Sequence, residues 1–321
     1  MHPDASSVTC SGGLVKSHSI SRNALKEIAE DGHVIAFQGG YDGFLRRDGD
    51  VEPKPIGLSN ASTFPAFCAK HDALTFSPIE QGQYAPCAEH AFLESYRAVC
   101  RELFWRQAGA RMDILRELDR GLPLDGQLAF QSLAAAEADN TQRVLSGLLQ
   151  LKALYDEALV ARDFSKITFY AVEFDGPPDV MMTSLFAPFV DFRGKVIRDS
   201  DPRGTTNDHL ILSLFASRSR GWFLLAWLGE SCAGLAFANS LAEQSAEEMP
   251  HAIMRLVFSD FENVFFRPTW WRGLSDPDKA HLRQRFWNPA NPFQPRRRDY
   301  LVDDGRRLVD WRVKAISGNL Q

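Results

Sequence analysis

Two segments near the start of the chain carry side chains that could bind a metal ion. Cys68 and His71 are separated by two residues in the string FCAKHD, while Cys10 and His18 flank the string SGGLVKS. Zinc in structural sites takes four sulfur or nitrogen ligands, and two of them often come from a closely spaced pair. We therefore predict a zinc ion held by Cys10, His18, Cys68 and His71.

The N-terminal half of this ligand set leaves alternatives open. Only Cys10 is evident there, and its partner is His18, His2 or a residue that precedes Met1. A C-x-x-H pair is also frequent by chance. The pair in FCAKHD therefore has three interpretations: it holds a structural zinc, it braces a catalytic core, or it binds no metal.

Together, the strings SH-x-I-S and FCAKHD, with Asn60 between them, resemble the HNH, or ββα-metal, group of nucleases over about residues 8–110. The resemblance implies a treble-clef-like module, with one zinc ligand pair on a hairpin and the other at the start of a helix. It also implies that His18 is the general base, that Asn60 holds the loop and that Asp72 binds a catalytic ion. The same strings are similar to those of a group of uncharacterised bacterial proteins.

The implied roles have a consistent chemistry. Hydrolysis of a phosphodiester needs a base that deprotonates water and a cation that offsets charge on the phosphate. The neutral imidazole of His18 suits the first role near pH 7. The carboxylate of Asp72 suits Mg²⁺ or Mn²⁺, whereas zinc would stay at the thiolates.

Each of these residues also has a structural interpretation. His18 can be a zinc ligand, or it can form a hydrogen bond at the start of a helix in SRNALKEI, where Ser19 or Ser21 would be the N-cap. Asn60 in LSNAST is typical of an Asx-turn. Asp72 is favourable near the N-terminal end of a helix.

The elements that must position these residues change in character along the chain. Residues 1–83 are rich in Gly, Ser and Pro, and residues 84–164 contain long stretches with apolar residues at helical spacing. Residues 165–321 contain apolar and β-branched runs, with SRSRG as a turn between two antiparallel strands. We predict an α+β protein with a zinc-binding HNH-like module at 1–83, a helical arm or hairpin at 84–164, and a mostly antiparallel sheet with flanking helices at 165–321.

Composition narrows the classes of function. The chain has 321 residues, a net charge of -5 and a pI near 5.9, so no global basic field indicates nucleic-acid binding, although PRRRDY is a local basic patch. Five cysteines, an odd number, without a secretory signal predict a cytoplasmic location. The longest apolar run, GWFLLAWLG, is too short for a membrane span.

Two functional hypotheses follow. The first is a zinc-binding, HNH-like nuclease that acts on DNA or RNA, by analogy in bacterial defence. The second is a non-catalytic protein whose structural zinc supports the binding of a protein or nucleic-acid partner. The position of His18 separates them, because a His18 that coordinates the zinc cannot act as the base.

Overall fold

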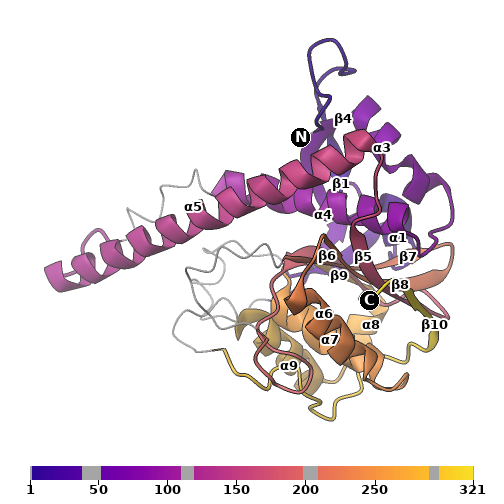
Figure 1. Cartoon of the computed structure of the whole chain (residues 1–321). Coiled ribbons are helices and arrows are strands. Elements are labelled where there is room, and N and C mark those ends of the chain that lie inside the picture. The colour runs from indigo at the N-terminus through magenta and orange to yellow at the C-terminus, as the bar shows by residue number, and fades with distance from the viewer. Residues whose placement is uncertain (1, 38–51, 110–118, 198–208, 289–295, 321) are drawn as a thin grey trace.

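The computed structural model describes residues 2–37, 52–109, 119–197, 209–288 and 296–320 (Figure 1). A large antiparallel sheet lies at the centre, and helices pack on both of its faces. The predicted α+β class is therefore confirmed. None of the helices within the described ranges is both long enough and apolar enough to cross a membrane.

The central sheet contains strands from both ends of the chain. Its order is β10-β5-β8-β7-β6-β9-β2-β3, and its neighbouring strands pair antiparallel. The strands are β2 (His33–Ala36), β3 (Lys54–Gly57), β5 (Ile167–Phe174), β6 (Val180–Phe186), β7 (Leu210–Ser217), β8 (Arg220–Leu228), β9 (Val264–Phe266) and β10 (Val313–Gly318). Because β2 pairs with β9, the sheet spans the predicted boundaries, and residues before 83 supply two of its strands.

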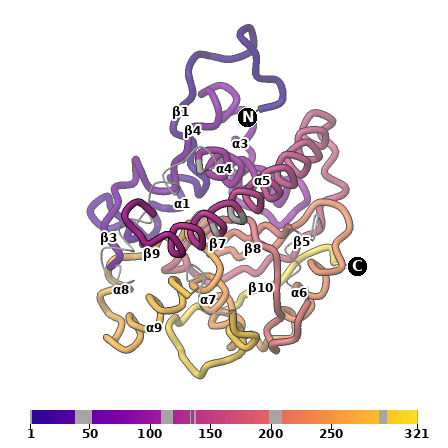
Figure 2. The backbone as a smooth tube through the Cα atoms, turned by 90° about the vertical axis from the view of Figure 1, so that its left-hand side faces the viewer, coloured from indigo at the N-terminus to yellow at the C-terminus, as the bar shows by residue number. Residues whose placement is uncertain are grey.

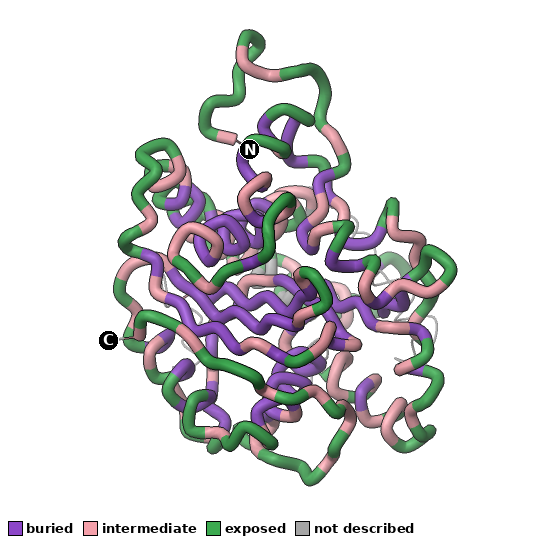
Figure 3. The backbone as a smooth tube through the Cα atoms, turned by 90° about the vertical axis from the view of Figure 1, so that its right-hand side faces the viewer, coloured by how far each residue is buried: buried purple, intermediate pink, exposed green. Residues whose placement is uncertain are grey.

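The central strands β7 and β8 form the hairpin that SRSRG predicts. Arg218 and Ser219 have φ values of 49° and 62°, as a two-residue type I′ turn requires. Both strands are buried along nearly their whole length, as the buried centre of the sheet in Figure 3 shows. Burial on both faces explains why they are continuous apolar runs in the sequence, without polar alternation.

One face of the sheet is covered by the first half of the chain. The helices there are α1 (Arg22–Lys26), α3 (Ala69–Gln81), α4 (Ala88–Gly109) and α5 (Leu124–Ala161). Their apolar side chains form one hydrophobic core with the sheet. Ser21 is the N-cap of α1, since its Oγ accepts a hydrogen bond from the Ala24 amide at 3.0 Å, which confirms one of the two predicted caps.

The opposite face is covered by the last third of the chain. The helices there are α6 (Cys232–Ala242), α7 (Met249–Asp260), α8 (Pro268–Gly273) and α9 (Asp276–Trp287). They enclose a second hydrophobic core with the other face of β5 to β9. The sheet thus separates two cores, as the layers in Figure 1 show.

Helices α4 and α5 form the predicted helical hairpin. Tyr96 of α4 donates a hydrogen bond to Asp156 Oδ1 of α5 at 2.8 Å, and Lys152 pairs with the same carboxylate. Leu148 is the first buried residue of α5 among its described side chains. The earlier part of α5 extends beyond the sheet and its covering helices as an arm (Figure 1).

A separate two-stranded sheet lies next to the residues that could hold a metal ion, and Cys68 is its last residue. It pairs β1 (Leu14–His18) with β4 (Thr63–Cys68), and α3 starts at the residue after β4. The loop that precedes β1 lies next to α3 at one end of the molecule (Figure 2).

Candidate metal centre

The register of the two-stranded β1–β4 sheet brings Cys10 next to Cys68. Leu14, the first residue of β1, pairs with Cys68, the last residue of β4. The segment 10–13 just before β1 therefore lies beside the end of β4. Two contacts hold this loop against the first turn of α3. Ser11 Oγ accepts a hydrogen bond from the Lys70 amide at 3.1 Å, and Lys70 Nζ donates to the Thr9 carbonyl oxygen at 3.1 Å.

Cys10, Cys68 and His71 form a compact group that could hold a metal ion. Cys68 Sγ and Cys10 Sγ lie 3.3 and 3.7 Å from His71 Nδ1, and the three ligand atoms all lie within 4.8 Å of one another. A tetrahedral zinc with its usual bond lengths separates a sulfur ligand from a nitrogen ligand by about 3.5 Å. The three atoms are therefore spaced like three corners of a zinc tetrahedron.

Burial and electrostatics prepare the group for a cation. Cys68 and His71 are buried, and Cys10 is partly buried. Hydrogen bonds from the backbone amides of His71 and Ser11 lower the pKa of the Cys68 thiol to about 6. The thiolate, which is the form that binds metal, therefore predominates at neutral pH. Neither cysteine is engaged in a disulfide.

His2 lies against this group. Its ring stacks on the His71 ring, with centroids 4.3 Å apart and an angle of 9° between the planes. Its Nδ1 accepts a hydrogen bond from the Asp4 amide at 3.1 Å. Burial, then the proximity of His71, lowers the pKa of His2, so its ring is neutral at pH 7. His2 is thus the nearest imidazole for a fourth position, as one of the sequence alternatives allowed.

His18 lies at the other end of the β1–β4 sheet. This position corrects the prediction that His18 is a zinc ligand. It pairs with Thr63, whereas Leu14 pairs with Cys68, so four residues of strand, or about 13 Å, separate the two ends. His18 Nε2 lies 3.2 Å from the Leu58 carbonyl oxygen, and a neutral imidazole donates this hydrogen bond. The group of ligands that the described residues form does not include His18.

Of the other two predicted catalytic residues, Asn60 lies near His18 but Asp72 does not. Asn60 is exposed near the His18 end, where its Oδ1 accepts a hydrogen bond from Lys16 Nζ at 2.8 Å. Asp72 lies in the first turn of α3, next to His71 and the metal ligands. His18 therefore lies at one end of the β1–β4 sheet, and Asp72 lies just beyond the other end. Burial lowers the pKa of His18, so its imidazole is neutral at pH 7.

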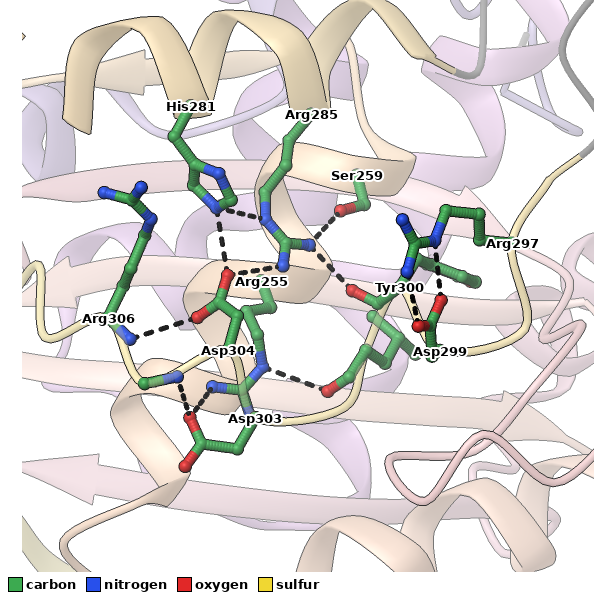
Figure 4. Close-up of polar contacts among 12 residues, drawn as sticks. Arg255, Ser259, His281, Arg285, Arg297, Asp299, Tyr300, Asp303, Asp304 and Arg306 are labelled. Carbon is green, nitrogen blue, oxygen red and sulfur yellow. Dashed lines mark hydrogen bonds and ion pairs between the residues drawn. The ribbon is translucent and has the colours of Figure 1, made fainter. Parts of the chain in front are cut away.

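A polar network at the other side of the molecule engages two of the three arginines in the basic patch PRRRDY, Arg296 and Arg297 (Figure 4). Arg297 forms a two-pronged ion pair with Asp299 through contacts of 2.8 and 2.6 Å, and Arg296 pairs with Asp260. Nearby, Arg285 donates to Asp304 Oδ2 at 2.7 Å and to the Tyr300 carbonyl oxygen. The charges of Arg296 and Arg297 are therefore used within the fold.

The polar residues on helix α4 were missed by the sequence analysis. Residues 91–100 are buried throughout, and this stretch includes the charged residues Glu94 and Arg97. Arg97 NH2 donates to Glu80 Oε1 of α3 at 2.7 Å, and its guanidinium stacks on Phe76. The available signal was the string AFLESYRAVC, in which charged residues interrupt an otherwise apolar helix face.

Comparisons with protein-family models, with curated proteins and with solved structures found no match to this chain.

Proposed function

We propose that Cys10, Cys68 and His71 bind one zinc ion in a treble-clef-like knuckle, and that the protein is a non-catalytic binding protein whose zinc has a structural role. The observation that carries the proposal is the spacing of the three ligand atoms, which matches a zinc tetrahedron. Two sulfurs and one nitrogen are the donors that favour zinc over Mg²⁺ or Mn²⁺.

The location of the ligands supports a structural role. They connect the N-terminal loop, the end of β4 and the first turn of α3, so an ion between them would staple three segments together. Structural zinc sites have four protein ligands and no open position. His2 is the protein side chain best placed to supply the fourth ligand and close the site.

The surface of the molecule favours a protein partner over a nucleic acid. Arg296 and Arg297 of the basic patch are paired with carboxylates, so they do not offer free positive charge to phosphates. The arm formed by the first half of α5 instead exposes leucines, with Leu124 70% and Leu128 59% exposed. Apolar side chains on a projecting helix are the kind of surface that a protein partner covers.

The nuclease remains as a second candidate because His18 has a neutral, half-buried imidazole, as a general base requires. In this candidate, Asp72 would hold Mg²⁺ or Mn²⁺, and Asn60 would support the loop. It requires His18 and Asp72 to act on one phosphate. However, His18 lies at one end of the β1–β4 sheet and Asp72 follows the other end, and these ends are about 13 Å apart.

Metal content per chain tests the zinc site. We expect one zinc per wild-type chain by elemental analysis, its loss in Cys68→Ser, and its retention in His18→Ala and in the control Cys87→Ser, whose exposed thiol lies outside the group. A wild-type protein without zinc, or a His18→Ala variant that loses it, would contradict the proposed ligand set.

Cleavage of plasmid DNA and of RNA with Mg²⁺ or Mn²⁺ tests the absence of catalysis. We expect no cleavage above that of the His18→Ala and Asp72→Ala variants. Metal-dependent cleavage by the wild type that both substitutions abolish would establish the nuclease instead.

A further inference from the structure

A polar cavity lies where the N-terminal half of the chain meets the central sheet. Its volume is about 290 Å³, and its walls come from α1, the end of α3, α4, β6 and β7. Pockets for small ligands start at roughly this size. The cavity is distinct from the Cys10, Cys68 and His71 group, because none of those residues lines it.

Glu94 is the buried ionisable side chain that lines this cavity. It is only 7% exposed, and within the described part of the chain its carboxylate accepts no hydrogen bond and forms no ion pair. Arg97, one turn further along α4, uses NH2 for Glu80 at 2.7 Å, while its Nε and NH1 atoms are buried without a partner. A buried carboxylate without a partner is unfavourable, so a ligand in the cavity that pairs with it would bind with a large gain in free energy.

The remaining walls add further hydrogen-bond acceptors. Glu27 and Glu80 add two further carboxylates, and Arg218 at the exposed rim is the one cationic side chain among the lining residues. On the sheet, the hydroxyls of Thr183 and Ser213 bond each other at 2.8 Å, so one of them also retains an acceptor position. The field in the cavity therefore favours a positive ligand that donates several hydrogen bonds.

We propose that this cavity binds a small organic cation with a guanidinium or primary ammonium group, and that Glu94 pairs with the charged group. An inorganic cation suits the site less well, because the three carboxylates do not come close enough together to form a group of metal ligands in the described chain. A flat or slender cation with several N–H donors fits both the acceptors and the volume. The proposal does not depend on the zinc site.

Calorimetry on the whole chain as purified tests the proposal with three probes. Arginine and agmatine carry the guanidinium, and citrulline is the neutral counterpart of arginine with almost the same shape. We expect at least one cation to bind and to raise Tm by roughly 3–5 °C at a concentration of about 100 times Kd. We expect citrulline to bind at least about tenfold more weakly. Equal affinities for arginine and citrulline, or no binding of either cation, would overturn the proposal.

The Glu94→Gln variant tests the role of the carboxylate, with Glu157→Gln on the exposed face of α5 as the matched control. We expect Glu94→Gln to weaken cation binding at least about tenfold and to leave citrulline unchanged, and Glu157→Gln to behave as the wild type. Unchanged cation affinity in a folded Glu94→Gln protein would refute the assignment.

The wild type provides a second test that needs no variant. Burial, which exceeds the opposing influence of Arg97, raises the pKa of Glu94 to about 7. Cation binding should therefore weaken about tenfold between pH 8 and pH 6 as this carboxylate becomes protonated. Affinity that stays constant over this range would also overturn the proposal. Glu27, Glu80, Arg97 and His18 are other ionisable groups near the cavity, so the Glu94→Gln profile serves as the reference.

Discussion

At the scale of single residues, burial and hydrogen bonding set the charge of the side chains on which the proposals rest. Glu94 shows this most clearly, because its carboxyl group is removed from water without gaining an ion-pair partner in the described chain. His18 and Cys68 lie on one hairpin, yet burial favours the neutral form of His18 while backbone amides favour the charged form of Cys68. The environment of each group, and not its type, sets its charge at pH 7.

Substitution of Glu94 should change the pH dependence of stability. Its pKa rises from 4.5 in the unfolded chain to about 7 in the fold, so the folded state binds this proton more tightly. The contribution of Glu94 to the free energy of unfolding is then fully present below pH 4.5, and about 3 kcal/mol of it is lost as the pH rises through 7. In Glu94→Gln this loss should disappear. Urea denaturation at pH 5 and pH 8 measures it, and parallel profiles for variant and wild type would disprove this origin.

Substitution of His2 should weaken the zinc site without abolishing it. His2→Ala leaves Cys10, Cys68 and His71 in place but removes the imidazole that stacks on His71. We expect one zinc per chain, held at least about tenfold more weakly in a competition with a chromophoric chelator. His33→Ala is the control, because that exposed ring bonds the Asp31 backbone. Equal zinc affinity in His2→Ala and the wild type would exclude His2 as a ligand.

At the scale of elements, close packing restricts some positions and leaves others open. A Cβ atom at Gly221, at the start of β8, would lie 2.5 Å from the Gly176 carbonyl oxygen, which belongs to the backbone and cannot move easily. At Gly147, inside α5, a Cβ atom would have no neighbour within 4 Å. The same substitution should therefore have opposite effects in the two elements.

We expect Gly221→Ala to lower the free energy of unfolding by about 1–3 kcal/mol through overpacking. We expect Gly147→Ala to raise it by about 0.5–1 kcal/mol, since alanine favours a helix interior and restricts the unfolded chain. Chemical denaturation of the two variants beside the wild type checks both signs. A neutral Gly221→Ala would show that the turn at Gly176 adapts.

At the scale of the whole molecule, zinc is expected to stabilise one end of the structure and not the fold as a whole. Two hydrophobic cores, one on each face of the central sheet, hold the remaining elements together without the metal-ligating residues. The proposed zinc would therefore differ from the zinc of an isolated finger, which is required for folding.

Removal of zinc with a chelator should expose only the N-terminal loop and the first turn of α3. We expect hydrogen exchange to increase at residues 2–13 and 69–72 and to remain slow in β5 to β8, with little change in far-UV circular dichroism. Exchange throughout the central sheet after chelation would mean that the ion supports the whole fold. The Cys68→Ser variant should reproduce the pattern of the chelated wild type.

The sequence by itself was sufficient for features that depend on neighbouring residues. The C-x-x-H spacing of Cys68 and His71 kept these two candidate ligands close together, and both lie at the start of α3. SRSRG became the turn between β7 and β8, and the helical periodicity of the second quarter of the chain became the α4–α5 hairpin. In each case, local geometry relates sequence spacing directly to spatial proximity.

Only the tertiary structure decided which distant residues meet. The register of β1 with β4 brought Cys10 to the metal ligands and placed His18 a strand length away, because side chains on a strand separate by about 3.3 Å per residue. The pairing of β2 with β9 joined both ends of the chain in one sheet. Burial of Glu94 against that sheet likewise depends on long-range packing, which the periodicity of a single helix does not encode.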